Sequence, residues 1–367
     1  MDESFVHTAT EAIMEKLNVL ILFGGQSSEH DVSLLSATNF ASLVNEEKYN
    51  LTKVYITENG EWFLFEGEKS EIKNVKNFTL EKRAFISPDT TSGLVVDDKG
   101  QVEYVKIDVV VPMLHGANGE DGTIQGLCAL AKIPCVGPDM ISSAVCMDKT
   151  FTKIMLKHLG IAQADWVTVL KREMKNMDAV IKRVEDKFDY PVFIKPANAG
   201  SSVGIGKAHN REDLVSCLEN AAQHDVRILV EEFIEGREVE CAVIGNDEPF
   251  ASVLGEIIPA KEFYDYESKY VIDSKLIIPA ILSERKADEV RETAKKAFVG
   301  LGLSGMSRVD FFVHKVTGNI YINEINTIPG FTNISMYPKL MGESGFEGEK
   351  LADKLIELAI SKFADIG

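Results

Sequence analysis

Four polar residues lie at the same end of two neighbouring runs of strand-forming residues. The stretch RVDFFVHKVTGNIYINEIN holds two runs rich in Val, Ile, Phe and Tyr around a short turn, which predicts a β-hairpin. In a strand, side chains of equal parity share a face, so Arg308 lies beside Asp310. By the same rule Glu324 lies beside Asn326. A three-residue turn centred on Thr317 would place Asp310 opposite Glu324 and bring the four polar side chains together.

This group could bind a divalent metal ion and a transferring phosphoryl group. The oxygens of Asp310, Glu324 and Asn326 are hard donors suited to Mg²⁺, but they are too few for a closed protein cage. Mg²⁺ held in this way completes its shell with water and nucleotide phosphate. Arg308 could stabilise charge on the phosphoryl group. The alternative is a solvated sheet end with incidental charges.

A glycine-rich stretch, FIKPANAGSSVGIGK, has a lysine at the end of a predicted strand. Its small residues let backbone N–H groups approach phosphate oxygens, and Lys195 adds a positive charge. The Gly-Lys-Ser/Thr ending of a Walker A motif is missing, so the stretch is more typical of a flap between two strands. A plain hairpin turn is the alternative.

Two further stretches could contribute to a nucleotide site. Lys149 lies early in a predicted helix, where the helix dipole disfavours a cation unless a phosphate is bound nearby. The stretch ILVEEFIEGREVE supplies Glu231, Glu232 and Glu238, whose backbone and carboxylates could contact adenine and ribose. A solvated lysine and an ordinary acidic strand end are the alternatives.

The first part of the chain has features of a small-ligand site. GGQSSEHDVS follows a buried strand and predicts a helix that starts near Ser27 or Ser28, but it is not GxGxxG and so argues against a dinucleotide site. The helix N-terminus favours an anion and Glu29 favours an ammonium group, a combination that suits an amino acid. His115 follows another buried strand, where it could contact a small ligand or serve as a structural histidine.

The elements predict an α/β protein. Before residue 138, buried strands alternate with helices, which indicates an α/β domain with a mainly parallel sheet and ligands at its carboxyl edge. Later stretches predict a single helix over 142–160 and a hairpin over 190–208. We expect three domains: 18–138, 139–231 and 232–367.

Bulk composition excludes several classes of protein. The 367 residues carry a formal net charge of −18, which repels nucleic acid and anionic membranes. The five cysteines lack metal or disulfide spacing, no apolar run approaches a membrane span, and the start lacks the features of a secretory signal. We therefore expect a cytoplasmic protein with no nucleic-acid or membrane partner.

Taken together, these stretches resemble the D-alanine–D-alanine ligase family of ATP-grasp enzymes. The motifs occur in family order and span about residues 18 to 340: GGQSSEHDVS, LHGANGEDGTIQG, MDK, IKPANAGSSVG, EEFIEGREVE, FYDYESKY, RVDFF and NEINTIPGFTNISMYP. The resemblance implies an ATP-grasp fold of three α/β domains, the first with a Rossmann-like parallel sheet. ATP would lie between the central and C-terminal domains, and the protein would be a homodimer.

The resemblance assigns one set of residues to ATP and its metal ions. Asp310, Glu324 and Asn326 would hold two Mg²⁺ ions, for which Mn²⁺ could substitute. A mobile lid over 261–271 would bring Lys269 to the γ-phosphate. The nucleotide site would comprise Lys149, Lys195, Ser201, Glu231, Glu232, Phe233, Glu238 and Lys269.

A second set would bind the amino-acid substrates. Glu29 would bind the ammonium group of the first D-alanine, in a hydrogen-bonded triad with Ser201 and Tyr270. Arg308 and the backbone N–H of Gly330 would stabilise the tetrahedral intermediate. The substrate-binding residues would be Glu29, His115, Lys269, Arg308, Ser335 and Met336.

The implied reaction makes D-alanyl-D-alanine for peptidoglycan through an acyl phosphate, releasing ADP and phosphate. Tyr270 goes with an amine acceptor and argues against D-lactate. D-serine is the alternative acceptor, as in ligases of the vancomycin-resistance type, although the apolar Met336 favours a methyl group. Two rival classes are a nucleotide-dependent dehydrogenase, which the missing GxGxxG disfavours, and a non-catalytic ATP-binding protein. The second would lack some of the four hairpin residues.

Overall fold

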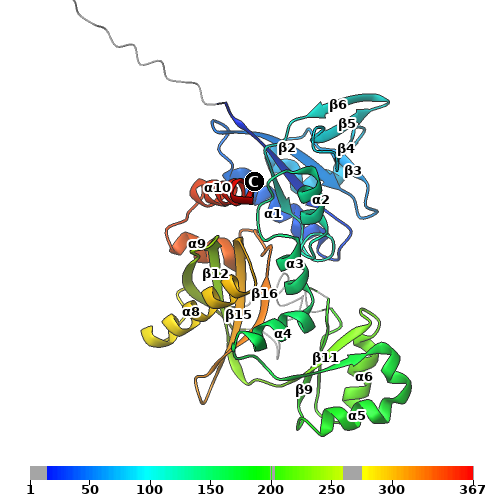
Figure 1. Ribbon diagram of the computed structural model, residues 1–367, viewed down its shortest axis with the longest axis vertical. Helices are drawn as coiled ribbons and strands as arrows, with labels where there is room; N and C mark the ends of the chain where they lie inside the picture. The colour runs from blue at the N-terminus through cyan, green and yellow to red at the C-terminus, as the bar shows by residue number, and fades with distance from the viewer. Residues whose placement is uncertain (1–14, 199, 201–202, 259–274, 367) are drawn as a thin grey trace, which may run out of the picture.

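The chain is organised around three β-sheets. A computed structural model describes residues 15–198, 200, 203–258 and 275–366. Figure 1 shows the first sheet at the top, the second at the lower right and the third at the lower left, with helices α3 and α4 running between them.

The first sheet has seven strands in the order β6-β5-β4-β3-β2-β1-β7. Its strands are β1 (Leu17–Gly24), β2 (Tyr49–Ile56), β3 (Trp62–Leu64), β4 (Arg83–Ile86), β5 (Leu94–Asp98), β6 (Gln101–Val105) and β7 (Val109–Met113). β1 pairs in parallel with β2 and β7, whereas β3 to β6 extend the sheet antiparallel. The expected parallel pairing is therefore confirmed at the buried centre of the sheet. The expectation of a mainly parallel sheet is wrong, because β3 to β6 pair antiparallel.

Helices from both ends of the chain cover this sheet. They are α1 (His30–Leu43), η1 (Lys69–Asn77), α2 (Thr123–Ala131) and the C-terminal α10 (Glu349–Ile366). We call the first sheet with α1, η1, α2 and their loops the first lobe. One hydrophobic core joins this lobe to the C-terminal part of the chain, because Phe23 and Phe40 share a cluster with Phe331 and Leu355. Figure 1 shows α10 beside this lobe. Helix α1 starts at His30, two to three residues later than expected, with Glu29 at its N-cap.

The second sheet is antiparallel, in the order β10-β9-β11-β8. Its elements are β8 (Trp166–Leu170), η2 (Lys171–Asn176), α5 (Met177–Glu185), β9 (Val192–Pro196), β10 (Gly206–Ala208), α6 (Arg211–Ala221) and β11 (Arg227–Glu232). The pairing of β9 with β10 confirms the expected hairpin, and it brings Lys195 to the end of a strand beside the glycine-rich loop.

The third sheet has the order β14-β13-β12-β15-β16. Its elements are β12 (Gly236–Gly245), β13 (Phe250–Ile258), β14 (Lys275–Ile277), α8 (Glu284–Gly300), β15 (Gly305–His314), β16 (Ile320–Asn326) and α9 (Met336–Glu343). The hairpin predicted over residues 308–326 is formed by β15 and β16, at one edge of this sheet.

The helix expected over 142–160 is two helices, α3 (Met140–Met147) and α4 (Lys149–His158). Asp148 separates them because its backbone is extended and its carboxylate accepts a hydrogen bond from the Thr150 N–H at 2.9 Å. An aspartate N-cap of this kind starts a new helix and places Lys149 in its first turn.

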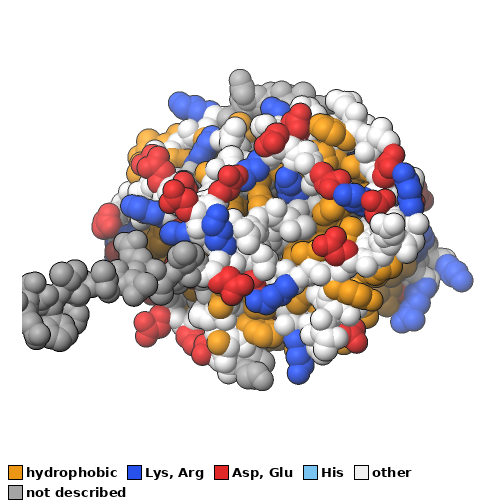
Figure 2. Space-filling model, turned by 90° about the horizontal axis from the view of Figure 1, so that it is seen from above, with side chains coloured by type: hydrophobic (Ala, Val, Ile, Leu, Met, Phe, Trp, Pro, Cys, Tyr) orange, Lys and Arg blue, Asp and Glu red, His pale blue; other side chains and the backbone are white. Residues whose placement is uncertain are grey.

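The surface of the first lobe carries charges of both signs. Figure 2 shows Lys and Arg side chains interspersed with Asp and Glu on the face seen from above. Ion pairs such as Lys82–Glu66 and Lys99–Glu81, each 2.6 Å long, belong to this lobe. Across the described residues, the helices are all too short or too polar to cross a bilayer.

Candidate active site

A pocket with a cavity volume of about 140 Å³ lies between the first lobe and the third sheet. Its walls come from the first lobe, from α3 and α4, from the third sheet and from the loop after β16. Among its lining residues are nine that the sequence predicted: Glu29, His115, Lys149, Arg308, Glu324, Asn326, Gly330, Ser335 and Met336. Residues far apart in the sequence thus converge on one cavity.

The hairpin has the predicted pairing at its polar end, but for a different reason. Arg308 pairs with Asn326, and Asp310 pairs with Glu324. The turn has four residues between the paired His314 and Asn319, so the expected three-residue turn is wrong. A β-bulge at Asn323 adds one residue to β16 and compensates for the longer turn.

Arg308 is fixed among carboxylates. Its Nε and Nη2 donate to the two oxygens of Asp310 at 2.7 and 2.8 Å, and Nε lies 3.0 Å from Glu240 Oε2. Burial opposes its charge, but Asp310, Glu240 and Glu324 together raise the pKa of Arg308 well above its usual value. The guanidinium is therefore a permanent cation in a nearly closed setting.

Three carboxylates form one row across neighbouring strands. Glu240 on β12 pairs with Asp310 on β15, which pairs with Glu324 on β16. Asn326 donates to Asp310 Oδ2 at 3.0 Å. These three carboxylates lie around the guanidinium of Arg308. Their oxygens are hard donors that fit Mg²⁺, so the residues present suit the predicted metal site.

A second charged cluster has more positive than negative side chains. Lys153 on α4 and Lys195 on β9 each lie 3.0 Å from a different oxygen of Glu231, and all three residues are at most 5% exposed. Lys195 also donates to Asn323 Oδ1 at 2.9 Å. Burial raises the pKa of Glu231, but the two ammonium groups outweigh it and lower the pKa to about 2. Two buried cations share one carboxylate, which favours an anionic ligand nearby.

Of the residues predicted to contact adenine and ribose, Glu232 and Phe233 directly follow Glu231 in the chain, whereas Glu238 lies on β12. Glu232 accepts a hydrogen bond from the Asp165 N–H at 2.8 Å, and the exposed Phe233 ring has Lys207 Nζ 3.9 Å from its centroid. Glu238 shares a face of β12 with Glu240, since the two are separated by one residue in a strand.

Glu29 reaches the pocket from the N-cap of α1, where two glycines make room for it. A Cβ on Gly116 would lie 2.7 Å from Glu29 Oε2, and one on Gly200 would lie 2.8 Å away. Gly116 also has a φ of +69°, which side chains rarely adopt. The carboxylate therefore lies where the first lobe meets the glycine-rich loop of the second sheet.

His115 lines the pocket with both ring nitrogens engaged. Nδ1 donates to the Ile328 carbonyl at 3.0 Å, so Nε2 is the acceptor for the Ser36 hydroxyl at 2.8 Å. Burial lowers the pKa of His115, which keeps the ring neutral. The hydrogen bonds of His115 are therefore those of a structural histidine, one of the two roles that the sequence left open.

Ser335 and Gly330 face each other at the far end of the pocket. A Cβ on Gly330 would lie 2.9 Å from Ser335 Oγ, and Ser335 is the N-cap of α9. Met336 packs against Gly255, where a Cβ would lie 2.6 Å from its sulfur. This end combines a hydroxyl, a helix N-terminus and an apolar wall.

Among the residues that sequence reasoning missed are several with polar contacts in or beside the pocket. They include Ser36, Glu120, Lys153, Glu240 and Asn323. Lys153 lies one helical turn after Lys149, and Glu240 has the parity of Glu238, so both carried a usable signal. Predicted Ser201, Lys269 and Tyr270, with the lid at 261–271, lie outside the described residues.

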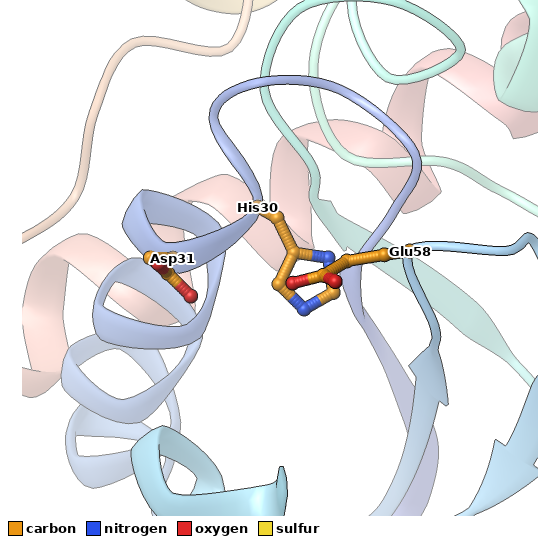
Figure 3. A group of neighbouring side chains, drawn as sticks. All are labelled: His30, Asp31 and Glu58. Atoms are coloured by element: carbon orange, nitrogen blue, oxygen red, sulfur yellow. The ribbon is translucent and has the colours of Figure 1, made fainter.

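A group of possible metal ligands lies outside the pocket, in the first lobe. Figure 3 shows His30 and Asp31 at the start of α1 with Glu58 from the loop after β2. Lys76 already pairs with Asp31 at 2.9 Å and Glu58 at 2.7 Å. His30 bonds the Gly25 carbonyl and the Tyr55 hydroxyl. These contacts make the group a structural cluster closed by a lysine.

A first α/β lobe followed by two antiparallel sheets that enclose a lysine- and carboxylate-lined pocket defines the ATP-grasp fold. The family profile described as the D-ala D-ala ligase N-terminus matches residues 18–138, and the one described as the C-terminus matches 155–357. The chain belongs to the D-alanine–D-alanine ligase family, a family of ATP-dependent ligases.

Relatives and solved structures agree with this membership. A D-alanine–D-alanine ligase of Clostridium acetobutylicum is 50% identical, covering 95% of this chain and 99% of its own. The crystal structure of the VanG D-Ala:D-Ser ligase from Enterococcus faecalis matches with a TM-score of 0.86 at 39% identity, over 94% of this chain and 100% of that one. The D-alanine–D-alanine ligase structure from Coxiella burnetii matches with a TM-score of 0.84 at 36% identity, over 96% of each.

Proposed function

We propose that the protein is a D-alanine–D-alanine ligase, which joins two D-alanines for peptidoglycan at the expense of ATP. One observation carries the proposal: Lys149 and Lys153 line the same pocket as the carboxylates Glu29, Glu240 and Glu324 and as Gly330. A metal-bound triphosphate needs both kinds of charge, and an amino acid needs an acidic group for its ammonium.

Nucleotide binding is assigned to the second sheet and α4. Lys149 and Lys195 would contact the phosphates. Lys149 lines the pocket, and Lys195 lies 3.0 Å from the buried Glu231, which supports this role. The backbone from Glu231 to Phe233 would take adenine, and Glu238 the ribose. Lys269 and Ser201 would complete the nucleotide site.

Chemistry is assigned to the hairpin. Two Mg²⁺ ions held by Asp310, Glu324 and Asn326 would draw charge from the terminal phosphates. Transfer of the γ-phosphoryl group to the carboxylate of the first D-alanine gives an acyl phosphate. The amine of the second D-alanine attacks the carbonyl carbon, and phosphate leaves. Arg308 and the Gly330 N–H would meet the negative charge that develops on the carbonyl oxygen.

Substrate binding is assigned to the two ends of the pocket. Glu29, in a triad with Ser201 and Tyr270, would bind the ammonium group of the first D-alanine. His115 would shape that subsite through packing, since both its nitrogens are used by the protein. Ser335, at the start of α9, would meet the carboxylate of the second substrate, beside the apolar Met336.

A D-alanine–D-serine ligase is the second candidate, and the likeness to the VanG structure favours it. One hydroxyl separates the two acceptors, and a pocket rejects such an addition only weakly. The sulfur of Met336 is packed against Gly255, which leaves an apolar wall that offers no partner to a hydroxyl. We therefore favour D-alanine.

We further propose three domains over 18–138, 139–231 and 232–367, a homodimer and a cytoplasmic location. The separate sheets support the domain division, although α10 packs on the first sheet. The proposed reaction consumes ATP and amino acids, both of which the cytoplasm supplies, and this supports the location.

The test is an assay of phosphate release with product identification by mass. We expect release that requires ATP, Mg²⁺ and D-alanine together, with D-alanyl-D-alanine as the product. Equal release with L-alanine, or none with either isomer, would overturn the ligase assignment. Competition between D-serine and D-alanine decides the acceptor, since an excess of the mixed dipeptide would establish the second candidate.

A further inference from the structure

The loop after β16 is held by side chains from the first lobe. This loop, residues 327–331, carries Gly330 between Ile328 and Phe331. Its backbone has no regular pairing, so its position depends on contacts that the rest of the molecule supplies.

Ile328 is bonded on both of its backbone polar groups. Its N–H donates to Glu120 Oε1 at 3.1 Å, and its carbonyl accepts from His115 Nδ1 at 3.0 Å. Glu120 is held in turn by the Gly116 N–H, which donates to Oε2 at 2.8 Å. Glu120 and His115 follow β7 on a single loop of the first lobe.

Phe331 is bonded in the same way from α1. Its N–H donates to Ser36 Oγ at 3.1 Å, and its carbonyl accepts from Asn39 Nδ2 at 2.8 Å. Its ring packs against Phe40, with 5.3 Å between the centroids. Ser36 also donates to His115 Nε2, so the α1 contacts and the β7-loop contacts form one connected network.

Four backbone groups, two of Ile328 and two of Phe331, are thus held by side chains of the first lobe. Two residues separate Ile328 from Phe331, and proline fixes one backbone angle of that short span. The direction of the Gly330 N–H is therefore determined by its two anchored neighbours. The network also reaches the Glu29 end of the pocket, because Ser27 Oγ donates to the His115 carbonyl at 2.6 Å and accepts from the Glu29 N–H at 3.2 Å.

We propose that Ser36, Asn39, His115 and Glu120 are positioning residues, which orient the Gly330 N–H toward the oxyanion of the tetrahedral intermediate. This inference rests on the proposed function. The first lobe would then contribute to the chemical step as well as to binding of the first amino acid. An error of about 1 Å in such a donor can cost about 100-fold in rate.

Two variants test the network at independent points. Glu120→Gln offers one acceptor to two N–H donors, and Ser36→Ala removes the acceptor of the Phe331 N–H. We expect each to lower kcat about 10- to 100-fold while the dissociation constant for ATP changes less than about 2-fold. Affinity for a phosphinate dipeptide, which presents the oxyanion of the intermediate, should fall in parallel with kcat.

The matched control is Lys48→Ala. Lys48 pairs with Asp353 on α10 at 2.6 Å, so it also joins the first lobe to a distant part of the chain, but it is remote from the 327–331 loop. Its kcat and analogue affinity should equal those of the wild type. If Glu120→Gln and Ser36→Ala keep wild-type kcat and analogue affinity, the positioning role is wrong.

A readout without turnover separates this inference from the proposed function. In Ser36→Ala the Phe331 amide should exchange with solvent about 10-fold faster, and in Glu120→Gln the Ile328 amide should do so. A wild-type protein that makes no D-alanyl-D-alanine would refute the proposed function, and with it the catalytic purpose of the network. Unchanged exchange at both amides would refute the network itself. If one variant does not fold, the other decides, and His115→Asn, which keeps a donor for the Ile328 carbonyl, serves as the conservative variant.

Discussion

Two enclosed glutamates in this molecule carry the same group and have opposite pKa shifts. Glu231 lies between the ammonium groups of Lys153 and Lys195, and its pKa is lowered to about 2. Glu120 lies beside Glu29. Burial, and to a smaller extent the negative charge of Glu29, raise the pKa of Glu120 to about 8.

The difference shows that fixed charges, more than hydrogen bonds, decide the ionisation of a carboxyl group in this pocket. Glu120 accepts two backbone N–H bonds, yet they do not offset its loss of water and its acidic neighbour. Glu231 is enclosed at least as fully and stays ionised because two cations face it. The Glu231 region is suited to an anion such as a triphosphate, and the Glu120 region to a cation such as an ammonium group.

The largest effect is expected from removing the guanidinium of Arg308. Arg308 opposes the raised pKa of Glu120 and is itself held by Asp310 and Glu240. Arg308→Ala should lower kcat by about 10²- to 10³-fold, because a donor aimed at developing charge is lost. Steady-state kinetics with ATP and D-alanine measure this. Arg237→Ala is the matched control, since Arg237 makes a similar double contact with Glu256 on the same sheet. Equal losses in both variants would make the Arg308 effect structural.

The second prediction concerns a variant that changes the Glu231 region alone. In Lys153→Met, Lys195 is the cation that remains beside Glu231 among the described residues. We expect a loss of about 2–3 kcal/mol in unfolding free energy and roughly 10-fold weaker ATP binding. Denaturant unfolding and calorimetric titration with ATP measure the two effects. Lys157→Met is the control, because Lys157 shares the Trp166 ring with Lys153 but is exposed on α4. Unchanged ATP affinity in Lys153→Met would separate this cluster from the nucleotide site.

A third prediction compares the pH dependence of the two glutamates. The unfolded value of both is 4.5. Between pH 4.5 and about 8 the folded state keeps the proton of Glu120, so stability relative to Glu120→Gln should fall as the pH rises. Between pH 4.5 and about 2 the unfolded state binds the extra proton at Glu231, so stability relative to Glu231→Gln should fall as the pH drops. Denaturant unfolding across this range should give difference curves of opposite slope, and parallel curves would contradict the comparison.

Local patterns in the sequence predict one side of this comparison better than the other. Parity on a strand was enough to group Arg308 with Asp310, and a lysine at a strand end was enough to mark Lys195. The pairing of Asp310 with Glu324 was correct only because the bulge at Asn323 cancels the longer turn. Neither the bulge nor the turn length has a strong local signal.

Contacts across long sequence separations explain what the sequence did not predict. Glu120 and Ile328 are 208 residues apart, and their hydrogen bond exists only because the first lobe meets the loop after β16. Lys153 shares a helix face with Lys149, but its partner Glu231 comes from a strand of the second sheet. The break at Asp148 could have been predicted from its capping type, but the apolar pattern continues through it.

The smallest effect is expected in the exposed acidic cluster of the first lobe, which extends the comparison to carboxylates in contact with water. Lys76 pairs with Asp31 and Glu58, and its side chain is 45% exposed. Lys76→Ala should cost less than about 1 kcal/mol in unfolding free energy, because solvent screens such pairs. The variant should also bind no Zn²⁺ in a calorimetric titration, since His30 keeps its contacts with Gly25 and Tyr55. A loss as large as that of Lys153→Met would mean that exposure does not separate these carboxylates from the enclosed ones.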